Sequence, residues 1–382
     1  MKMLHTSDFH LGLRLCEAPM NGELEAALGE IAEIARREEC TAVLAAGDLY
    51  DRSNPSPESV AIFDRFVTEL AQSGIALLAV SGNHDSPERV AYLSELLREA
   101  GVFFSPLYDG NVSPVTLTDE FGEADFWLLP FLRPVNVRAA VPEFEGESFT
   151  EAVRCAVERL PLHPERRNVL LTHQYVVGSL SDGADSSDGI PEVGGGGAVS
   201  AEVFAPFDYA ALGHLHGAHP VTRETVRYSG SPIKCSFAEA GDEKSVTLVE
   251  LREKGSVTVR PIPLHPIRDL REFRGTYAEA VSPEVRGILG REDYLRIILT
   301  DEEDIPDVLA KLRTIYPNLL RLSYDNARTR AVGEYTELSE DRNGEALSPR
   351  AVFAELYEKQ NGLAPDDEVM ALADSIFREV TA

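Results

Sequence analysis

The fold is decided by an apolar run that ends in a polar turn, Ile75-Ala76-Leu77-Leu78-Ala79-Val80-Ser81-Gly82-Asn83-His84-Asp85. A short apolar run bounded by turn residues predicts a β-strand that ends in a loop. The same arrangement occurs four more times in the first 220 or so residues, and it predicts strands at Met3–Ser7, Val43–Ala46, Val169–Leu171 and Tyr209–Leu212. The polar motifs that follow the five strands are Asp8-Phe9-His10, Gly47-Asp48, Gly82-Asn83-His84-Asp85, Thr172-His173-Gln174 and Gly213-His214-Leu215-His216.

Helical patterns lie between the early strands. Apolar residues recur at helical spacing from Leu24 to Ile34, Ser56-Pro57 and Gly74 bracket a second helix, and Ser86-Pro87 and Gly101 bracket a third. Strands that alternate with helices predict an α/β layered core. Later β-rich segments indicate a second sheet or a mixed sheet edge; they are Phe126–Phe131, Ser245–Leu251 and Val257–Ile262.

Composition narrows the class of protein. The 382 residues contain no apolar stretch long enough for a membrane helix, no secretory h-region at the start, and four scattered cysteines. We therefore expect a cytoplasmic protein with reduced thiols. The chain has 36 Lys and Arg against 64 Asp and Glu, a net charge of −28. This acidic balance argues against tight DNA binding by the chain alone, because phosphate contacts need basic side chains.

The five motifs together predict a metal site. Parallel strands end at one edge of a sheet, so residues far apart in sequence are expected to converge there. They would bring together seven oxygen and nitrogen donors, Asp8, His10, Asp48, Asn83, His173, His214 and His216. Without a thiolate, a structural zinc site of the cysteine type is not expected. Seven donors exceed what one ion needs and suit two ions with a shared carboxylate.

Each motif alone is also compatible with a structural turn, and the prediction depends on all five occurring in order after strands. Five of the nine histidines fall in these motifs. The remaining four are expected to be structural; they are His5, His163, His219 and His265.

The motif series resembles that of calcineurin-like metallophosphoesterases, and several details resemble their SbcD exonuclease branch. The opening segment His5-Thr6-Ser7-Asp8-Phe9-His10-Leu11-Gly12 is similar to that of the branch. So are Gly47-Asp48-Leu49-Tyr50-Asp51 followed by Pro55-Ser56-Pro57, and Tyr228-Ser229-Gly230-Ser231-Pro232 after the last motif. The resemblance implies a four-layered β-sandwich flanked by helices, with a small α/β cap domain and C-terminal helices.

The resemblance also implies roles for the donors. One ion would be held by Asp8, His10, Asp48 and His216, and the other by Asp48, Asn83, His173 and His214, with Asp48 bridging. Manganese is the usual ion of the family, although the donor set alone also accepts iron or zinc. His84 would lie over the phosphate and either donate a proton to the leaving oxygen or stabilise the transition state; the alternative is that it only supports a ligand. Archaeal and eukaryotic relatives carry a second histidine near Asp51, and no role of that histidine transfers to this chain.

The resemblance divides the chain into a nuclease domain (1–265), a DNA-facing cap domain (266–325), a linker (326–347) and a C-terminal helical segment (348–382). The last segment would dock on an SbcC-type ATPase, which would supply much of the grip on DNA, or it would pack on the cap. A homodimer is expected from the family alone, since Ile62, Phe66 and Leu70 fit a core equally well. Gly178–Gly197 is either an inert loop or a flap near the substrate.

Three functions are compared. The first is a metal-dependent DNA exonuclease, with endonuclease action on single strands or hairpins, that works with the ATPase. The second is a phosphodiesterase for a cyclic nucleotide or small phosphoester, which would not need the last 115 or so residues. The third is a tethering scaffold with a decayed site, which the complete set of seven donors disfavours.

Overall fold

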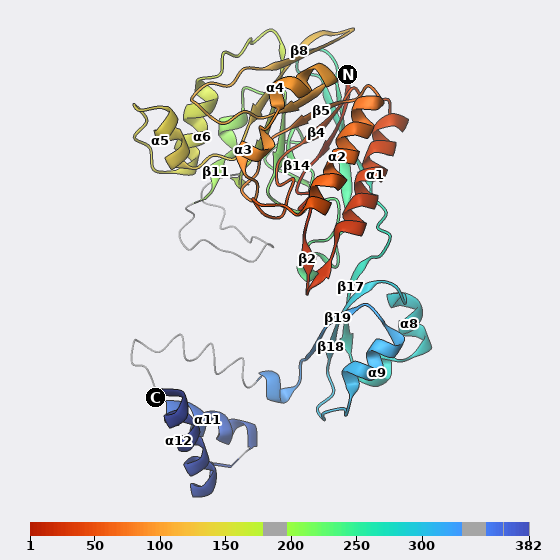
Figure 1. Cartoon of the computed structure of the whole chain (residues 1–382), viewed down its shortest axis with the longest axis vertical. Helices are drawn as coiled ribbons and strands as arrows, with labels where there is room; N and C mark the ends of the chain where they lie inside the picture. The colour runs from red at the N-terminus through yellow and green to blue at the C-terminus, as the bar shows by residue number, and fades with distance from the viewer. Residues whose placement is uncertain (179–196, 331–348, 362, 382) are drawn as a thin grey trace. The chain divides into compact units, whose positions relative to one another are not determined.

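The computed structural model describes residues 1–178, 197–330, 349–361 and 363–381, which fall into two compact units, Met1–Leu270 and Arg271–Ala382 (Figure 1). Most of the loop predicted at Gly178–Gly197 and of the linker predicted at 326–347 lies outside the described residues. The division into four parts therefore stays a prediction. None of the described helices combines the length and apolar character that a membrane span requires.

The first unit contains two six-stranded sheets. The order in the first sheet is β16 (Val257–Pro263), β15 (Ser245–Leu251), β1 (Lys2–Thr6), β4 (Ala42–Ala45), β5 (Ala76–Ala79) and β6 (Val102–Phe104). The strands from β1 to β6 are parallel, whereas β15 and β16 are antiparallel to their neighbours. The order in the second sheet is β13 (His219–Pro220), β14 (Val226–Tyr228), β12 (Tyr209–Gly213), β9 (Arg167–His173), β8 (Gly122–Leu129) and β7 (Val115–Asp119). Its strands β8, β9, β12 and β14 are parallel.

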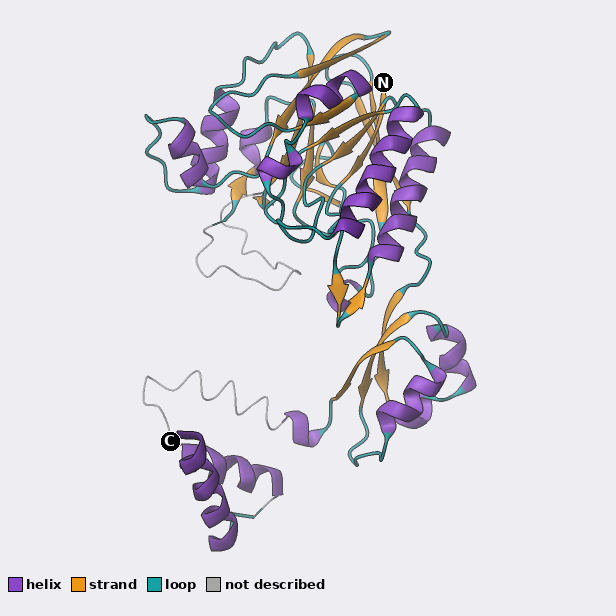
Figure 2. Ribbon diagram, in the orientation of Figure 1, coloured by secondary structure: helices purple, strands orange, loops and turns teal. Residues whose placement is uncertain are grey.

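The two sheets pack face to face with helices outside, as Figure 2 shows. Alternate residues of the strands form the core between the sheets, for example Leu44 and Leu78 from the first sheet and Leu171 and Tyr209 from the second. Their neighbours in sequence point the other way, and Leu170 and Leu212 join the core under the helices of the second sheet. The helices on the first sheet are α1 (Asn21–Arg37) and α2 (Pro57–Gln72), and those on the second are α5 (Pro134–Ala140) and α6 (Phe149–Glu158). The predicted four-layered α/β sandwich is confirmed.

One predicted helix is wrong. The segment between Ser86-Pro87 and Gly101 is divided into α3 (Pro87–Val90), α4 (Ser94–Leu97) and a 3₁₀ turn at Arg98–Ala100. Leu93 breaks the helix because its φ is 59°, a left-handed conformation. Val90 is buried but Leu93 and Leu96 are exposed, so the apolar residues of this segment do not form one continuous buried face that would keep a single helix in place.

Short elements complete the first unit. They are β2 (Arg14–Leu15), β3 (Ala18–Pro19), β10 (Val176–Val177), β11 (Val199–Ser200) and the 3₁₀ turns Ala201–Phe204 and Phe237–Glu239. The residues considered for a dimer interface, Ile62, Phe66 and Leu70, are buried on the inner side of α2. They belong to the core of this unit.

The second unit begins with a small α/β layer. Its sheet has the order β17 (Leu270–Gly275), β18 (Tyr294–Leu299) and β19 (Leu319–Tyr324), and its helices are α7 (Tyr277–Ala280), α8 (Pro283–Leu289) and α9 (Val308–Ile315). A core around Leu295, Ile297 and Leu312 holds the layer together. Two further helices, α11 (Pro349–Asn361) and α12 (Asp367–Thr381), form a hairpin in which the rings of Phe353 and Phe377 meet edge to face.

Candidate metal centre

The loops that follow β1 and β4 run side by side and carry the first of the predicted donors. The N–H of Asp8 donates to the carbonyl of Gly47 at 3.0 Å, and the N–H of His10 donates to the carbonyl of Asp48 at 2.9 Å. These backbone bonds continue the parallel pairing of the two strands beyond their ends. The carboxylates of Asp8 and Asp48 are thereby fixed at one edge of the first sheet.

The second sheet brings its own donors to the same place. His173 ends β9 and His214 directly follows β12, which pairs with β9 in parallel. The sheets can approach here because Gly213 has no side chain: a Cβ at this position would collide with the carbonyl oxygen of Ala46, just after β4. Glycine is therefore required where the two strand ends meet.

Four of the seven predicted donors have a strained backbone. The φ angles are 54° at Asp8, 47° at His10, 49° at Asp48 and 111° at His214. Residues other than glycine rarely adopt positive φ, and such conformations cluster at functional sites, where the surrounding structure enforces them. At this edge of the sheets, four of the donor side chains are therefore attached to backbone in an unusual, strained conformation.

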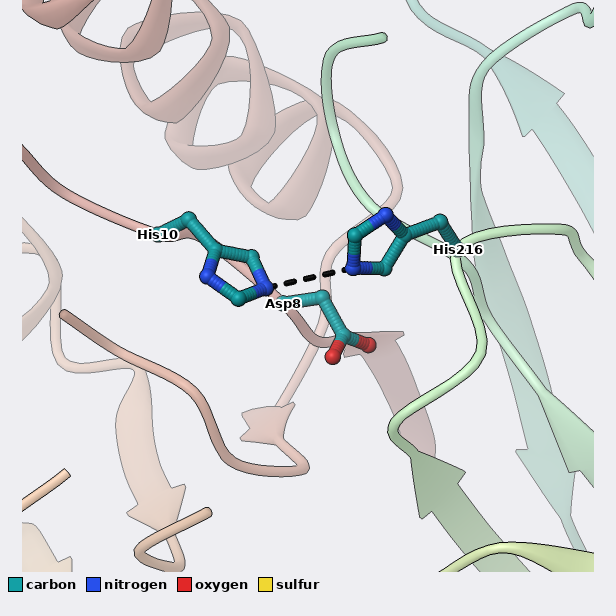
Figure 3. A group of neighbouring side chains, drawn as sticks. All are labelled: Asp8, His10 and His216. Carbon is teal, nitrogen blue, oxygen red and sulfur yellow. Dashed lines mark hydrogen bonds between the residues drawn. The ribbon is translucent and has the colours of Figure 1, made fainter. Parts of the chain in front are cut away.

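We call Asp8, His10 and His216 the Asp8 group (Figure 3). The Nε2 atoms of His10 and His216 lie 3.2 Å apart, and the Asp8 carboxylate completes the cluster. The Nδ1 atom of His216 faces a carboxylate oxygen of Glu239 at 3.2 Å, and Nδ1 of His10 faces Asp51 at 3.7 Å. A proton is drawn to Nδ1 in both rings, so the two Nε2 lone pairs point into one space. A cation satisfies both lone pairs.

We call Asn83, His173 and His214 the Asn83 group. The Oδ1 atom of Asn83 lies 3.0 Å from both Nε2 of His173 and Nδ1 of His214. The carbonyl of Ala46 can only accept, so Nδ1 of His173 donates to it at 2.8 Å and Nε2 of a neutral ring has a lone pair. This lone pair faces acceptor oxygens of Asn83 and Asp48, so no proton joins them when the ring is neutral. A metal ion bound between these atoms would satisfy all of them.

Asp48 lies between the two groups. Its Oδ2 atom is 3.7 Å from Nε2 of His10 and 3.3 Å from Nε2 of His173, and only 2 % of the residue is exposed. Burial alone would raise the pKa of this carboxyl, but the charge and hydrogen bond of His173 and the charge of His10 hold it well below its usual range. Asp48 is therefore ionised at neutral pH, and its carboxylate lies within 4 Å of a histidine of each group.

The pKa values of the two histidines in the Asn83 group shift in opposite directions. Burial alone would lower the pKa of His173, yet the charge and hydrogen bond of Asp48 raise it to about 9. For His214, burial and the charge of His173 lower the pKa to about 4. Nitrogen and oxygen donors whose lone pairs face inward around the carboxylates of Asp8 and Asp48 fit two divalent ions.

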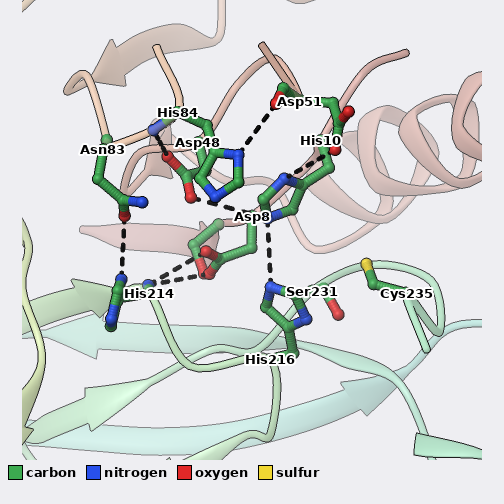
Figure 4. Close-up of polar contacts among 12 residues, drawn as sticks. Asp8, His10, Asp48, Asp51, Asn83, His84, His214, His216, Ser231 and Cys235 are labelled. Carbon is green, nitrogen blue, oxygen red and sulfur yellow. Dashed lines mark hydrogen bonds and ion pairs between the residues drawn. The ribbon is translucent and has the colours of Figure 1, made fainter. Parts of the chain in front are cut away.

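His84 is exposed at the same rim (Figure 4). Its backbone N–H donates to Oδ1 of Asp48 at 2.9 Å, and its Nδ1 donates to the carbonyl of Asp51 at 2.9 Å. The ring meets that of His10 edge to face at 4.9 Å. These contacts fix the ring through Nδ1, and Nε2 takes no part in them.

The predicted residues converge, and the sequence prediction missed three that support them. Asp85 follows His84 and accepts the N–H groups of Leu49, Tyr50 and Gly82, which ties together the loops after β4 and β5. Burial and the charge of Asp48 raise the pKa of Asp85 to about 6. Its place in the Gly82–Asp85 motif is the only sequence signal for this role.

The other two missed residues are Asp51, which faces His10, and Glu239, which faces His216. In the sequence Asp51 ends the Gly47–Asp51 segment that resembles the SbcD branch, but nothing there indicates a contact with His10, and Glu239 lies outside every motif. The histidines expected to be structural lie outside the two groups. His5 is buried, and its Nδ1 bonds to the hydroxyl of Tyr209 at 2.9 Å.

The fold and the donor set describe a metal-dependent phosphoesterase domain. The model of the calcineurin-like phosphoesterase family matches residues 1–218, and the chain belongs to this family. The Type 5 capsule protein repressor C-terminal domain model, SbcD_C, matches residues 266–361. A curated relative from Staphylococcus epidermidis, the D subunit of the nuclease SbcCD, is 27 % identical over 326 residues, which cover 85 % of each chain. The resemblance to the SbcD branch is confirmed.

Two solved structures are also similar to the chain. The protein TT1561 of Thermus thermophilus has 14 % identity and a TM-score of 0.38, covering 68 % of this chain and 98 % of its own. A dimetal phosphatase from Danio rerio has 12 % identity and a TM-score of 0.40, covering 68 % of this chain and 95 % of its own. At these values neither likeness adds to the assignment.

Proposed function

We propose that the chain is a metal-dependent DNA nuclease that hydrolyses phosphodiester bonds in DNA repair and recombination. It would degrade duplex ends, cut single strands or hairpins, and work with an SbcC-type ATPase. The observation that carries the proposal is the convergence of seven donors and the exposed His84 at one rim of a calcineurin-like phosphoesterase domain. The relative that belongs to a nuclease and the SbcD_C match beyond residue 265 favour DNA over a small phosphoester.

In this proposal one ion is held by Asp8, His10, Asp48 and His216, and the other by Asp48, Asn83, His173 and His214. The distances within each set and the position of Asp48 between them support this division. Manganese is the ion that we propose, since it accepts mixed oxygen and nitrogen donors. Hydrolysis assays with manganese, iron and zinc would test this choice, and a preference for zinc would contradict it.

When bound, the two ions would activate a water molecule and offset the charge of the phosphate. The side chains of the protein would position the ions and supply a proton. Asp48 keeps the two sets of ligands in register, and the bond from Nδ1 of His84 to the Asp51 carbonyl aims Nε2 at the open rim. From there Nε2 of His84, in its protonated form, would donate a proton to the leaving oxygen.

The decisive experiment is digestion of end-labelled linear duplex DNA with added manganese, with and without the ATPase partner. We expect His84→Ala to reduce cutting roughly 10²- to 10⁴-fold, the contribution of a positioned acid, while two ions stay bound. His163→Ala is the matched control, because His163 is exposed and lies outside the two donor groups. It should leave cutting unchanged.

The same assay separates the rival function. Wild-type protein that leaves DNA intact with its partner, yet hydrolyses bis-p-nitrophenyl phosphate, would replace the nuclease by a small-molecule phosphodiesterase. Equal DNA cutting by His84→Ala and wild type would remove the role given to His84.

The C-terminal helices are proposed to dock on the ATPase, while the cap faces DNA. The hairpin of α11 and α12 exposes Leu363 and Ile376, which supports a binding face. A basic partner would also explain how a chain with a net charge of −28 reaches DNA. Ile376→Asp should weaken binding of the purified ATPase in titration calorimetry, and unchanged binding would favour packing on the cap.

We also propose a homodimer. The residues that would form it are not Ile62, Phe66 and Leu70, which are buried, but the exposed residues of the broken helix. Tyr92 is 70 % exposed and Leu96 is 66 % exposed, so this segment offers apolar surface. Sedimentation velocity should show a dimer that Leu96→Arg dissociates, and a monomeric wild type would contradict the proposal.

A further inference from the structure

Glu239 is a buried carboxylate that no sequence motif includes. It ends the 3₁₀ turn Phe237–Glu239, and only 4 % of the residue is exposed. An ionised carboxylate at such burial is stable only when it is paired and hydrogen-bonded. The partners of Glu239 therefore indicate why it is there.

Four donors saturate this carboxylate. Oε1 accepts from Nδ1 of His216 at 3.2 Å and from the hydroxyl of Ser236 at 3.1 Å. Oε2 accepts from Nζ of Lys244 at 2.5 Å and from the N–H of Cys235 at 3.1 Å. The ion pair with the ammonium of Lys244 and the three further hydrogen bonds fix this carboxylate on both oxygens.

Lys244 holds the same histidine by its backbone. It is 9 % exposed, and its Nζ donates to the carbonyl of His216 at 3.0 Å as well as to Glu239. The N–H of Ser231 also donates to this carbonyl, at 3.1 Å. Glu239 fixes the ring of His216, while Lys244 and Ser231 fix its main chain.

The cluster is a support and not an additional metal site. His216, Cys235 and Glu239 place potential ligand atoms within 4.8 Å of one another. The ammonium of Lys244 already supplies the positive charge beside Glu239, and Nδ1 of His216 carries the proton of that hydrogen bond. A histidine whose Nδ1 proton bonds to a carboxylate presents Nε2 as a stronger and better-aimed ligand.

We infer that Glu239 and Lys244 position His216 and thereby set the affinity of the Asp8-group ion without affecting the Asn83-group ion. The inference rests on the proposed metal ligands, and it adds two positioning residues to them. The selectivity follows from the contacts, because neither Glu239 nor Lys244 has a bond to Asn83, His173 or His214.

Calorimetric titration of the metal-free full-length chain with manganese tests the inference, and bound metal is counted afterwards by mass spectrometry. Wild type should bind two ions. In Glu239→Ala one ion should bind about 10- to 100-fold more weakly, the usual effect of losing such a support, and the other should be unchanged. Lys244→Met should weaken the same ion by a smaller factor. Glu243→Ala, in the exposed residue next to Lys244, is the matched control and should match wild type.

Two further variants keep the result interpretable. Glu239→Gln retains an acceptor for His216 and should lie between wild type and Glu239→Ala; it replaces the alanine variant if that chain does not fold. Combining Glu239→Ala with Asn83→Ala should weaken both ions.

Equal affinities in Glu239→Ala and wild type, or a uniform loss of both ions, would overturn the inference. Wild type that binds fewer than two ions would overturn the proposed function and the inference with it.

Discussion

The two donor groups of the metal centre are held in different ways. In the Asn83 group, the ring of His173 is held by the backbone carbonyl of Ala46, and the N–H of His214 is held by the carboxylate of Asp8. In the Asp8 group, the rings of His10 and His216 face the side chains of Asp51 and Glu239.

This difference determines which amino-acid substitutions can disturb each group. The backbone carbonyl that holds His173 cannot be removed by substitution, and the carboxylate that holds the N–H of His214 belongs to Asp8, itself a proposed metal ligand. The Asp8 group depends on outer side chains that a single substitution removes. We expect one ion to be a stable part of the fold and the other to be adjustable.

The largest effect is expected where the two groups meet. Asp48→Asn removes the charge that both groups share, so both ions should bind more weakly and DNA cutting should fall by roughly 10³-fold. Metal counting by mass spectrometry and the DNA assay measure these changes. If Asp48→Asn kept one ion at full affinity, Asp48 would belong to one group alone.

A second prediction concerns the Asn83 group, which a substitution at Gly213 should disturb by displacing the backbone. In Gly213→Ala the new Cβ would collide with the Ala46 carbonyl and lie 2.8 Å from Nδ1 of His173. Overpacking of this kind costs about 1–3 kcal/mol in the free energy of unfolding, and the Asn83-group ion should be weakened most.

Urea denaturation and manganese titration measure the two effects. Gly217→Ala is the matched control, because a Cβ there would meet no atom within 4 Å. A Gly213→Ala chain with the stability and affinities of wild type would show that the strand ends can separate without loss.

The sequence predicts the proposed metal ligands better than the residues that hold those ligands in position. Asp8, Asp48, Asn83, His173 and His214 each follow an apolar strand, and the rule that parallel strands end at one edge was enough to predict that they converge. The alternation of strands and helices predicted an α/β layered core, whereas the four-layered sandwich was implied by the resemblance to calcineurin-like metallophosphoesterases. Which β-rich segment joins which sheet could not be predicted, because pairing between distant strands leaves no local signal.

The supports and the broken helix show why the rest was missed. Glu239 and Lys244 lie in a loop more than 20 residues after His216, and no periodicity connects them with it. The helix expected after Ser86-Pro87 has plausible ends, yet Leu93 turns left-handed inside it. Caps indicate where a helix begins, whereas continuity depends on a buried face that only the packed structure provides.

The smallest effect is expected at Asp51 and sharpens the comparison within the Asp8 group. Its carboxylate lies 3.7 Å from Nδ1 of His10, farther than Glu239 lies from His216, so Asp51→Asn should weaken the Asp8-group ion by about 10-fold at most. The bond from His84 goes to the backbone carbonyl of Asp51, which the substitution keeps. Saturating manganese should therefore restore the rate of DNA cutting, and the exposed neighbour Ser53→Ala should need no extra manganese. A rate that stays low in excess manganese would mean that the side chain of Asp51 acts on His84 and not only on His10.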